Sequence, residues 1–195
     1  MMSQRQQPWF ALHVRPRYEQ LAAAALRSKG YEEFLPLYSE RRIWSDRIKE
    51  IRLPLFPGYL FCRIDLDRRL PVLTTSGILS IVGAGRAPLP VPDREVAWVR
   101  AIVDSGAVAK PWERLAAGQP VIVEHGPLRG LEGVLVEVRG HAHLIVSVVL
   151  LQRSVCVEIE RHWARPVDAI RPAETQRFQC GKEHRLSAGR QMEVA

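Results

Sequence analysis

Four short patterns in this sequence contain residue types that could carry out catalysis or bind a metal. His141 and His143 could share a metal ion from one side of a strand, but no third ligand follows nearby, and a turn is the more ordinary place for them. Asp65 and Asp67 could form a carboxylate pair, although a helix N-terminus explains them better. GRAPLP and GPLRGLEG lack the features of a phosphate-binding loop, and no Ser or Cys lies in a GxSxG elbow. The sequence therefore predicts a protein that is not an enzyme and needs no metal or cofactor.

Basic residues form a stronger pattern than these candidates. Two arginines flank Pro16, and the segment 39–54, SERRIWSDRIKEIRLP, carries five basic residues and a tryptophan. Three acidic residues in the same segment also fit a charge-balanced, solvated loop. We expect the basic side chains to attract nucleic-acid phosphates without reading bases. The residues of this group are Arg15, Arg17, Arg41, Arg42, Trp44, Arg47, Lys49 and Arg52.

The stretch 55–61, LFPGYLF, combines aromatic residues with a Pro-Gly turn. After the turn, Tyr59, Phe61 and Arg63 point to one face of a strand and the apolar residues between them point to the other. Because the first face carries two rings, both faces need cover. Exposed aromatic residues cluster at interaction hot spots. Phe56 and Tyr59, which border the turn, therefore predict a partner-binding surface that Trp9 could share. For Phe61, a core position and a surface position remain equally open.

The composition limits the class of protein. The chain has 195 residues, 47% hydrophobic and 25% charged, which suits one globular domain of fair size or two small ones. The formal charge of +7 favours an anionic partner, with nucleic acid ahead of an anionic membrane. No apolar run could span a bilayer, and the start MMSQRQQP lacks the apolar core of a signal peptide. Three cysteines far apart, Cys62, Cys156 and Cys180, fit a reducing cytoplasm.

The first half alternates between strand and helix patterns. This order of elements is typical of an α+β sandwich with a mostly antiparallel sheet. The period-2 and helical repeats predict a strand at 9–14, a helix at 17–29, a strand at 34–38, a protruding hairpin or loop at 39–54, a strand at 59–64, a short helix at 65–73, a strand at 78–82 and a helix at 95–103.

The second half is rich in Val and Ile. Four β-type runs separated by Gly-bearing turns, within residues 121–160, predict a small all-β barrel. The polar composition after residue 170 predicts a disordered tail. The resulting division is a disordered start at 1–7, a first domain at 8–104, a linker at 105–115, a second domain at 116–170 and a tail at 171–195.

These motifs together resemble the NusG family of transcription elongation factors. WFALHVRPRYEQ (9–20) looks like the family's opening strand and helix, and LFPGYLF is similar to its FPGY motif. GILSIVG (77–83), with the Pro-rich segment and helix after it, matches the end of the family's N-terminal (NGN) domain. GQPVIVEHGPLRGLEGVLVEV (118–138) looks like a KOW motif, the mark of the C-terminal SH3-like barrel. The two linked motifs, in the right order, make the resemblance specific.

The resemblance implies an NGN domain that binds the clamp helices of the largest RNA polymerase subunit in a hydrophobic depression. It places Trp9, Phe56 and Tyr59 in that depression, with Phe61 beside them. A factor that spans the polymerase cleft helps to keep the clamp closed and suppresses pausing, because it binds the processive state better than the paused one. Thr74 and Thr75 lie where specialised members touch the opposite cleft wall, and the basic segment would lie near upstream or non-template DNA.

The resemblance also implies that the KOW barrel recruits Rho or a small-subunit ribosomal protein through an apolar edge. By position, that edge holds Leu128, Leu150, Leu151 and Gln152. General NusG proteins carry an aromatic residue and a glycine there, so their absence argues against Rho and leaves ribosomal coupling open. RPRYEQ, LYSERRIWSD and LPLFPGYLF look closer to specialised antiterminator members. The valine-rich runs disfavour a helical second domain, so we expect a stable barrel in the free protein.

We therefore expect a cytoplasmic, monomeric transcription elongation and antitermination factor with no membrane contact. Two alternatives remain. A ribosome- or RNA-associated KOW binding protein would need only the barrel and the basic charge, and an enzyme would need a metal at His141 and His143. General and operon-specific action are not distinguished by these residues.

Overall fold

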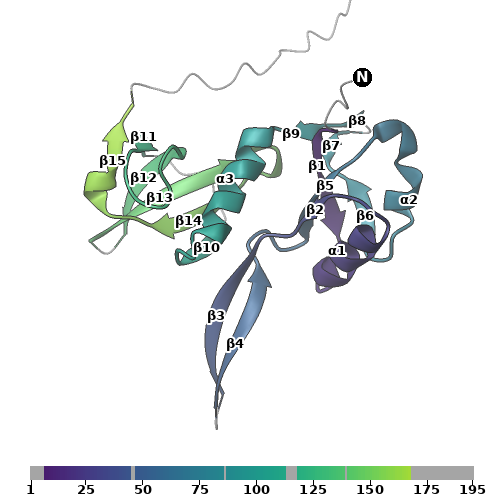
Figure 1. Ribbon diagram of the computed structural model, residues 1–195, viewed down its shortest axis with the longest axis horizontal. Coiled ribbons are helices and arrows are strands. Elements are labelled where there is room, and N and C mark those ends of the chain that lie inside the picture. The colour runs from purple at the N-terminus through teal and green to yellow at the C-terminus, as the bar shows by residue number, and fades with distance from the viewer. Residues whose placement is uncertain (1–6, 45–46, 86, 113–117, 139, 168–195) are drawn as a thin grey trace, which may run out of the picture.

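The computed structural model describes residues 7–44, 47–85, 87–112, 118–138 and 140–167. Figure 1 shows two β-rich halves with helix α3 (Asp93–Asp104) between them and a long hairpin that projects away from both. Each half contains one main sheet, called the first and the second sheet below. Every ladder among the described strands is antiparallel, which confirms the mostly antiparallel α+β architecture.

The first sheet forms where the sequence alternates with period 2. Its path is β2-β5-β1-β6, and a short strand, β9, also pairs with β1. In β1, Phe10, Leu12 and Val14 face one side, while Trp9 and Ala11 face the other, and all five are buried. The strands are β1 (Trp9–Val14), β2 (Glu33–Phe34), β5 (Tyr59–Arg63), β6 (Ile78–Ile81) and β9 (Pro90–Val91).

Helices cover the first of these two faces. Small side chains at Ala22 and Ala23 let α1 (Glu19–Ser28) pack closely against it, and Leu26 is fully buried there. The predicted short helix is split into a 3-10 turn, η1 (Leu66–Arg68), and α2 (Leu70–Leu73). Asp65 caps the turn as predicted, because its Oδ1 accepts the Asp67 N–H at 3.0 Å.

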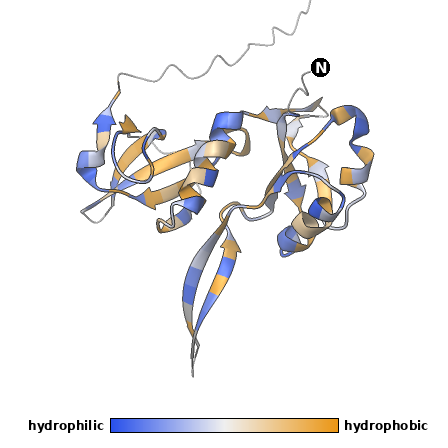
Figure 2. Ribbon diagram, viewed as in Figure 1, coloured by the Kyte–Doolittle hydropathy of each residue, from blue (hydrophilic) through white to orange (hydrophobic). Residues whose placement is uncertain are grey.

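The predicted strand at 34–38 divides at Pro36. Glu33–Phe34 joins the first sheet, while Leu37 already belongs to β3 (Leu37–Trp44), which pairs along its length with β4 (Arg47–Pro54). Proline lacks an N–H and interrupts a ladder, which explains the break. The protruding hairpin is confirmed, and Figure 2 shows hydrophilic and hydrophobic residues mixed along it. A smaller hairpin pairs β7 (Gly83–Ala84) with β8 (Ala87–Pro88).

The second half is all β, as predicted. Its sheet follows the path β10-β14-β13-β12-β11-β15, and no described ladder joins the two ends of that path. Closure into a barrel therefore stays a prediction. The elements are β10 (Ala109–Trp112), β11 (Gln119–Val123), β12 (Glu132–Val138), β13 (His141–Val148), η2 (Val149–Leu151), β14 (Arg153–Glu158), η3 (Arg161–Trp163) and β15 (Ala164–Pro166).

β10 lies inside the segment predicted as a linker. It pairs with β14 from Ala109 opposite Val157 to Trp112 opposite Ser154.

Among the described residues, no helix has the length and apolar character needed to cross a lipid bilayer.

Leu60 tests the helix-covered face of the first sheet. It is fully buried, so we expect Leu60→Ala to lower the free energy of unfolding by about 2–5 kcal/mol in urea denaturation. Leu79→Ala is the matched control, because Leu79 is 56% exposed and should change stability by about 0.5 kcal/mol or less. Equal losses in both variants would contradict this packing.

Candidate interaction surfaces

The Pro-Gly turn before β5 is held by helix α1. The Gly58 N–H donates to Oε1 of Glu19 at 3.0 Å, and the Gly58 carbonyl accepts the Val14 N–H at 2.7 Å. Gly58 has φ +82°, in the left-handed region that favours glycine. Glu19 is itself buried. The turn is therefore anchored to the fold and fixes where Tyr59 begins its strand.

The face of the first sheet opposite α1 carries a group of aromatic side chains. Phe61 stands edge-on to Phe56, with ring centroids 5.8 Å apart, and is stacked with Phe34 at 6.2 Å. Tyr59 is stacked on His13 at 5.5 Å and is half-buried. Trp9, Phe56 and Phe61 are at most 3% exposed. We call Trp9, Phe34, Phe56, Tyr59 and Phe61 the aromatic face.

Two arginines join the aromatic face to helix α3. The Arg63 guanidinium lies over the Trp9 ring at 4.7 Å, and Arg100 of α3 lies over the same ring at 5.5 Å and over Phe34 at 5.0 Å. Arg63 also pairs with Asp93 at the start of α3 (3.2 Å). These cation–π contacts and ion pairs hold α3 on the sheet. Sequence reasoning missed Arg100, but the alternation of Arg63 with Phe61 already placed Arg63 on this face.

The second sheet packs against the other side of α3. One apolar cluster runs from the aromatic face through Val96, Val99 and Ile102 of α3 to Val146 and Val155 of the second sheet. The two halves therefore share this cluster, while the helix-covered face of the first sheet has a second cluster of its own.

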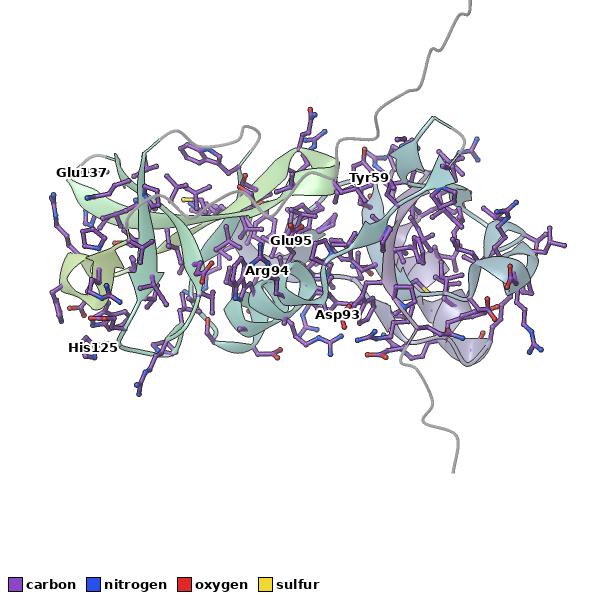
Figure 3. All side chains as sticks on the ribbon, turned by 90° about the horizontal axis from the view of Figure 1, so that it is seen from above. Tyr59, Asp93, Arg94, Glu95, His125 and Glu137 are labelled. Carbon is purple, nitrogen blue, oxygen red and sulfur yellow. The ribbon has the colours of Figure 1, made fainter. Side chains whose placement is uncertain are left out.

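Among the described residues, one hydrogen bond links α3 to the second sheet. Oε2 of Glu95 accepts the backbone N–H of Val149 in η2 at 3.2 Å. Figure 3 shows Glu95 on α3, in the middle of the molecule. Glu95 is 6% exposed, and burial raises the pKa of its carboxyl, an effect that the Val149 hydrogen bond and Arg94 partly oppose. Sequence reasoning did not identify Glu95, because its partner lies more than fifty residues further along the chain.

Three comparisons relate this chain to known proteins. A family model described as "NusG: Transcription termination factor nusG" matches residues 7–100. The transcription termination/antitermination protein NusG of Deinococcus radiodurans is 31% identical over 129 residues, which are 56% of this chain and 67% of that protein. The chain belongs to the NusG family. NusG of Thermus thermophilus is 29% identical over 173 residues, covering 78% of this chain and 94% of that protein.

A solved structure supports the fold of this NusG family member. The structure described as "Domain interaction in Thermotoga maritima NusG" is 18% identical, covers 84% of this chain and 98% of that one, and superposes with a TM-score of 0.53. The likeness extends over both halves. The first half, which the family model matches, is called the NGN domain below. The second half is called the KOW domain, after the motif that residues 118–138 resemble.

The residues predicted to bind RNA polymerase are brought together only in part. Trp9, Phe56, Tyr59 and Phe61 all lie on the aromatic face, but Tyr59 alone among them is half-exposed. The two threonines lie elsewhere, at the end of α2. Thr74 is exposed, whereas Thr75 is 4% exposed and its hydroxyl contacts the Pro71 carbonyl and Lys29 Nζ.

The predicted KOW edge is partly buried as well. Leu128 is 1% and Leu151 is 8% exposed, while Leu150 is half-buried and packs against the shared cluster. Gln152 is exposed and adopts φ +51° after η2. The turn that carries Leu150 and Leu151 is the one whose Val149 N–H contacts Glu95.

The predicted nucleic-acid contacts lie in two places. Arg15 and Arg17 are exposed beside α1, and Arg15 lies over the Tyr18 ring at 5.6 Å. Arg41 and Lys49 are exposed on the hairpin. Arg52 is exposed nearer the base of the hairpin. The side chains of the other three hairpin positions lie outside the described residues, and these positions are Arg42, Trp44 and Arg47.

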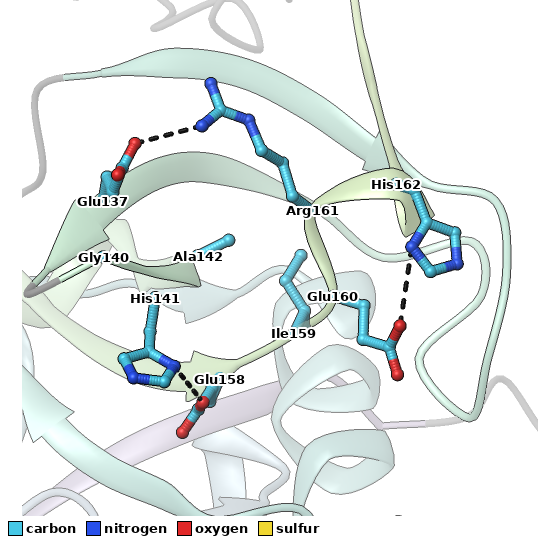
Figure 4. A pocket seen from close by; sticks show the side chains of 9 residues that line it. All are labelled: Glu137, Gly140, His141, Ala142, Glu158, Ile159, Glu160, Arg161 and His162. Atoms are coloured by element: carbon cyan, nitrogen blue, oxygen red, sulfur yellow. Dashed lines mark hydrogen bonds and ion pairs between the residues drawn. The ribbon is translucent and has the colours of Figure 1, made fainter.

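The two histidines considered as metal ligands do not converge. His141 Nδ1 lies 3.0 Å from Oε1 of Glu158, while His143 Nδ1 lies 3.0 Å from the His141 backbone carbonyl. A hollow of about 580 Å³ is lined by His141 but not by His143. Figure 4 shows this hollow, in which Arg161 pairs with Glu137 at 3.1 Å. Within the described ranges, no group of three or more His, Cys, Asp or Glu side chains is placed to hold a metal ion.

Glu95 predicts a pH dependence of stability. Its pKa is raised in the folded protein, so the folded state binds the proton more tightly than the unfolded state does. We expect the free energy of unfolding of the wild type to fall, relative to Glu95→Gln, as pH rises from the ordinary carboxyl range through this raised pKa.

Chemical denaturation of both proteins across that range measures the difference. Asp104→Asn, at the exposed end of the same helix, is the matched control and should follow the wild type. A wild-type curve that stays parallel to that of Glu95→Gln would contradict the burial of this carboxyl.

Proposed function

We infer that this NusG-family chain is a non-catalytic transcription elongation and antitermination factor that binds RNA polymerase through its aromatic face. The observation that carries this proposal is the aromatic face, which gathers these rings on one side of the first sheet. The turn at 56–59, similar to the family's FPGY motif, fixes where Tyr59 lies. Tyr59 and His13 form the accessible part of this group of rings. Trp9, Phe56 and Phe61 form an apolar floor that a helical partner surface could contact once the KOW domain moves away.

The proposed effect on transcription follows from differential binding. A factor that binds the clamp helices on one side of the cleft and, at Thr74, the opposite side would bind the closed-clamp polymerase better than the open one. The difference in affinity then shifts the polymerase population towards the processive state, which reduces pausing and termination. No chemical step is required of the factor.

The hairpin fits a role beside DNA. It projects from the body of the protein (Figure 1), and Arg41 and Lys49 are exposed on it. Its eight-residue strands span about 26 Å at roughly 3.3 Å per residue, so cations near its tip could reach a duplex or a displaced strand beyond the polymerase contact.

The KOW domain is proposed to recruit a second partner. A small-subunit ribosomal protein is the expected one, and Rho is disfavoured by the residues at the edge. Leu150 and Gln152 are the accessible members of that edge, while Leu128 and Leu151 support it from below.

Tyr59→Ala tests the polymerase site. Tyr59 is half-buried, so its truncation should remove a hot-spot contact without unfolding the domain, and we expect binding to core RNA polymerase to weaken by about 30-fold, or about 2 kcal/mol. Titration of labelled factor with polymerase measures this. Phe56→Ala is less informative, because Phe56 is 1% exposed and its loss would also destabilise the fold.

Tyr31→Ala is the matched control. Tyr31 is also half-buried but packs against the helix-covered cluster on the other side of the sheet. Equal binding by both variants would remove Tyr59 from the site. A wild-type protein that binds ribosomes or RNA but not polymerase would favour the KOW-protein alternative.

The hairpin predicts a salt-dependent contact with DNA. If Arg41 and Lys49 each neutralise one phosphate, the double substitution to Ala should reduce the slope of log affinity against log salt by about 1.8 for duplex DNA, with no change in sequence preference. Fluorescence anisotropy at several salt concentrations measures the slope. Arg68→Ala with Arg69→Ala, which removes two exposed arginines near α2, should leave it unchanged. A similar loss in both double variants would indicate general attraction by net charge.

A further inference from the structure

The chain between the two domains contains a strand that is already bound. β10 forms the outermost ladder of the KOW sheet, against β14. Ala109 is 5% exposed and belongs to the shared apolar cluster, whereas Val108 just before it is 69% exposed. The change from exposed to buried at this step marks where the connection ends and the KOW sheet begins.

This attachment leaves a very short connection. Helix α3 ends at Asp104, so only residues 105–108 separate it from β10. Fully extended, these residues span about 14 Å. They are also held in a turn, because the Ala107 N–H donates to Ser105 Oγ and Gly106 adopts φ +69°. With β10 in place, the KOW domain cannot move far from α3.

Release of β10 would change that limit. Residues 109–112 would join the connection, whose maximal span would rise to at least about 28 Å. β10 is also a weak strand, since it has four residues and Pro111 offers no N–H to the ladder. Its contact with β14 is thus one that the protein could break without unfolding either domain.

We propose that β10 is a strap that keeps the KOW domain on α3, and that its release from β14 lets the KOW domain separate and opens the way to the aromatic face. In the strapped form the junction holds Glu95 against Val149 and the shared cluster stays closed. The part of the proposal that concerns access by polymerase rests on the proposed function. The part that concerns domain separation does not.

Cys156 provides a lock for the test. It lies directly opposite Lys110 in the β10–β14 ladder. Opposed residues in antiparallel strands have Cα atoms about 4.5–5.5 Å apart, within the range that a disulfide bridges. In Lys110→Cys, oxidised glutathione can take two electrons and two protons from the thiols of residues 110 and 156, forming the disulfide and reduced glutathione.

The other described cysteine does not compete for this disulfide. Cys62 is fully buried in the helix-covered cluster of the NGN sheet, whereas Cys156 lies directly opposite residue 110. Cys180 lies outside the described residues and is replaced by Ser in every protein used. Lys110→Cys with Cys156→Ser cannot form the strap disulfide and is the control for oxidation.

A charge introduced at the buried end of β10 should break the strap. Ala109→Asp places a carboxylate in the apolar cluster, and we expect β10 to leave β14 and the radius of gyration in small-angle X-ray scattering to rise. Val108→Asp makes the same change one residue earlier at an exposed position and should keep the wild-type value. Equal radii for the two variants would overturn the proposal, whatever polymerase does.

The lock gives the second readout. Oxidised Lys110→Cys should keep the compact radius and bind polymerase at least about tenfold more weakly than its reduced form, because the competent population is suppressed. The Cys156→Ser control should bind equally under both conditions. Equal binding by the oxidised and reduced lock would overturn the link to the aromatic face. Absence of polymerase binding by every protein, with the expected radii, would refute the proposed function and leave the strap in place.

Discussion

The structure depends on the need to cover both faces of the NGN sheet. β1 and β5 are apolar on each side, so helices α1 and α2 on one side leave an aromatic surface on the other. Burying apolar area is worth roughly 25 cal/mol per Å², and rings the size of Trp9, Phe56 and Phe61 make that surface costly to leave in water. α3 covers it in part, held by Arg63 and Arg100, and the KOW domain completes the shared cluster. The burial of this aromatic surface therefore also joins the two domains.

The local sequence predicts the features that depend on near neighbours. Alternation at 59–63 indicates a strand with two covered faces, the alanine-rich run predicts a helix that packs closely, and Asp65 acts as the cap expected of it. For the candidate site, the sequence predicted which aromatic residues lie together but not how exposed they are. The aromatic residues do share one face, because strand periodicity fixes which side chains lie together. Their exposure does not follow from periodicity, so the burial of Phe56 and Phe61 could be learned only from the fold.

The differences arise where distant parts of the chain decide the outcome. AKPW, the sequence of β10, has no alternation and contains a proline, so it reads as linker until β14 offers an edge more than forty residues away. Thr75 was expected to face a partner, but Lys29 and the end of α2 occupy its hydroxyl. Glu95 looks like either of the two acidic residues in a first helical turn, and only the position of η2 makes it a buried acceptor. Each case depends on a contact between elements that are distant in the sequence, and the local secondary-structure propensity of a residue does not predict such contacts.

When a surface is buried in one state and used for binding in another, the contact that covers it must not be too strong. A short connection gives the covering domain a high effective concentration, which is of millimolar order for short flexible linkers, so even a weak interface stays closed. The junction here matches that expectation, since the hydrogen bond described across it involves a carboxylate whose burial opposes its charge. A stronger junction would reduce the apparent affinity for any partner in proportion to the competent fraction. Part of the free energy that keeps the domains together comes from β10, a four-residue strand with a proline. Release of this strand from β14 would therefore lower both the effective concentration of the KOW domain at α3 and the stability of the interface.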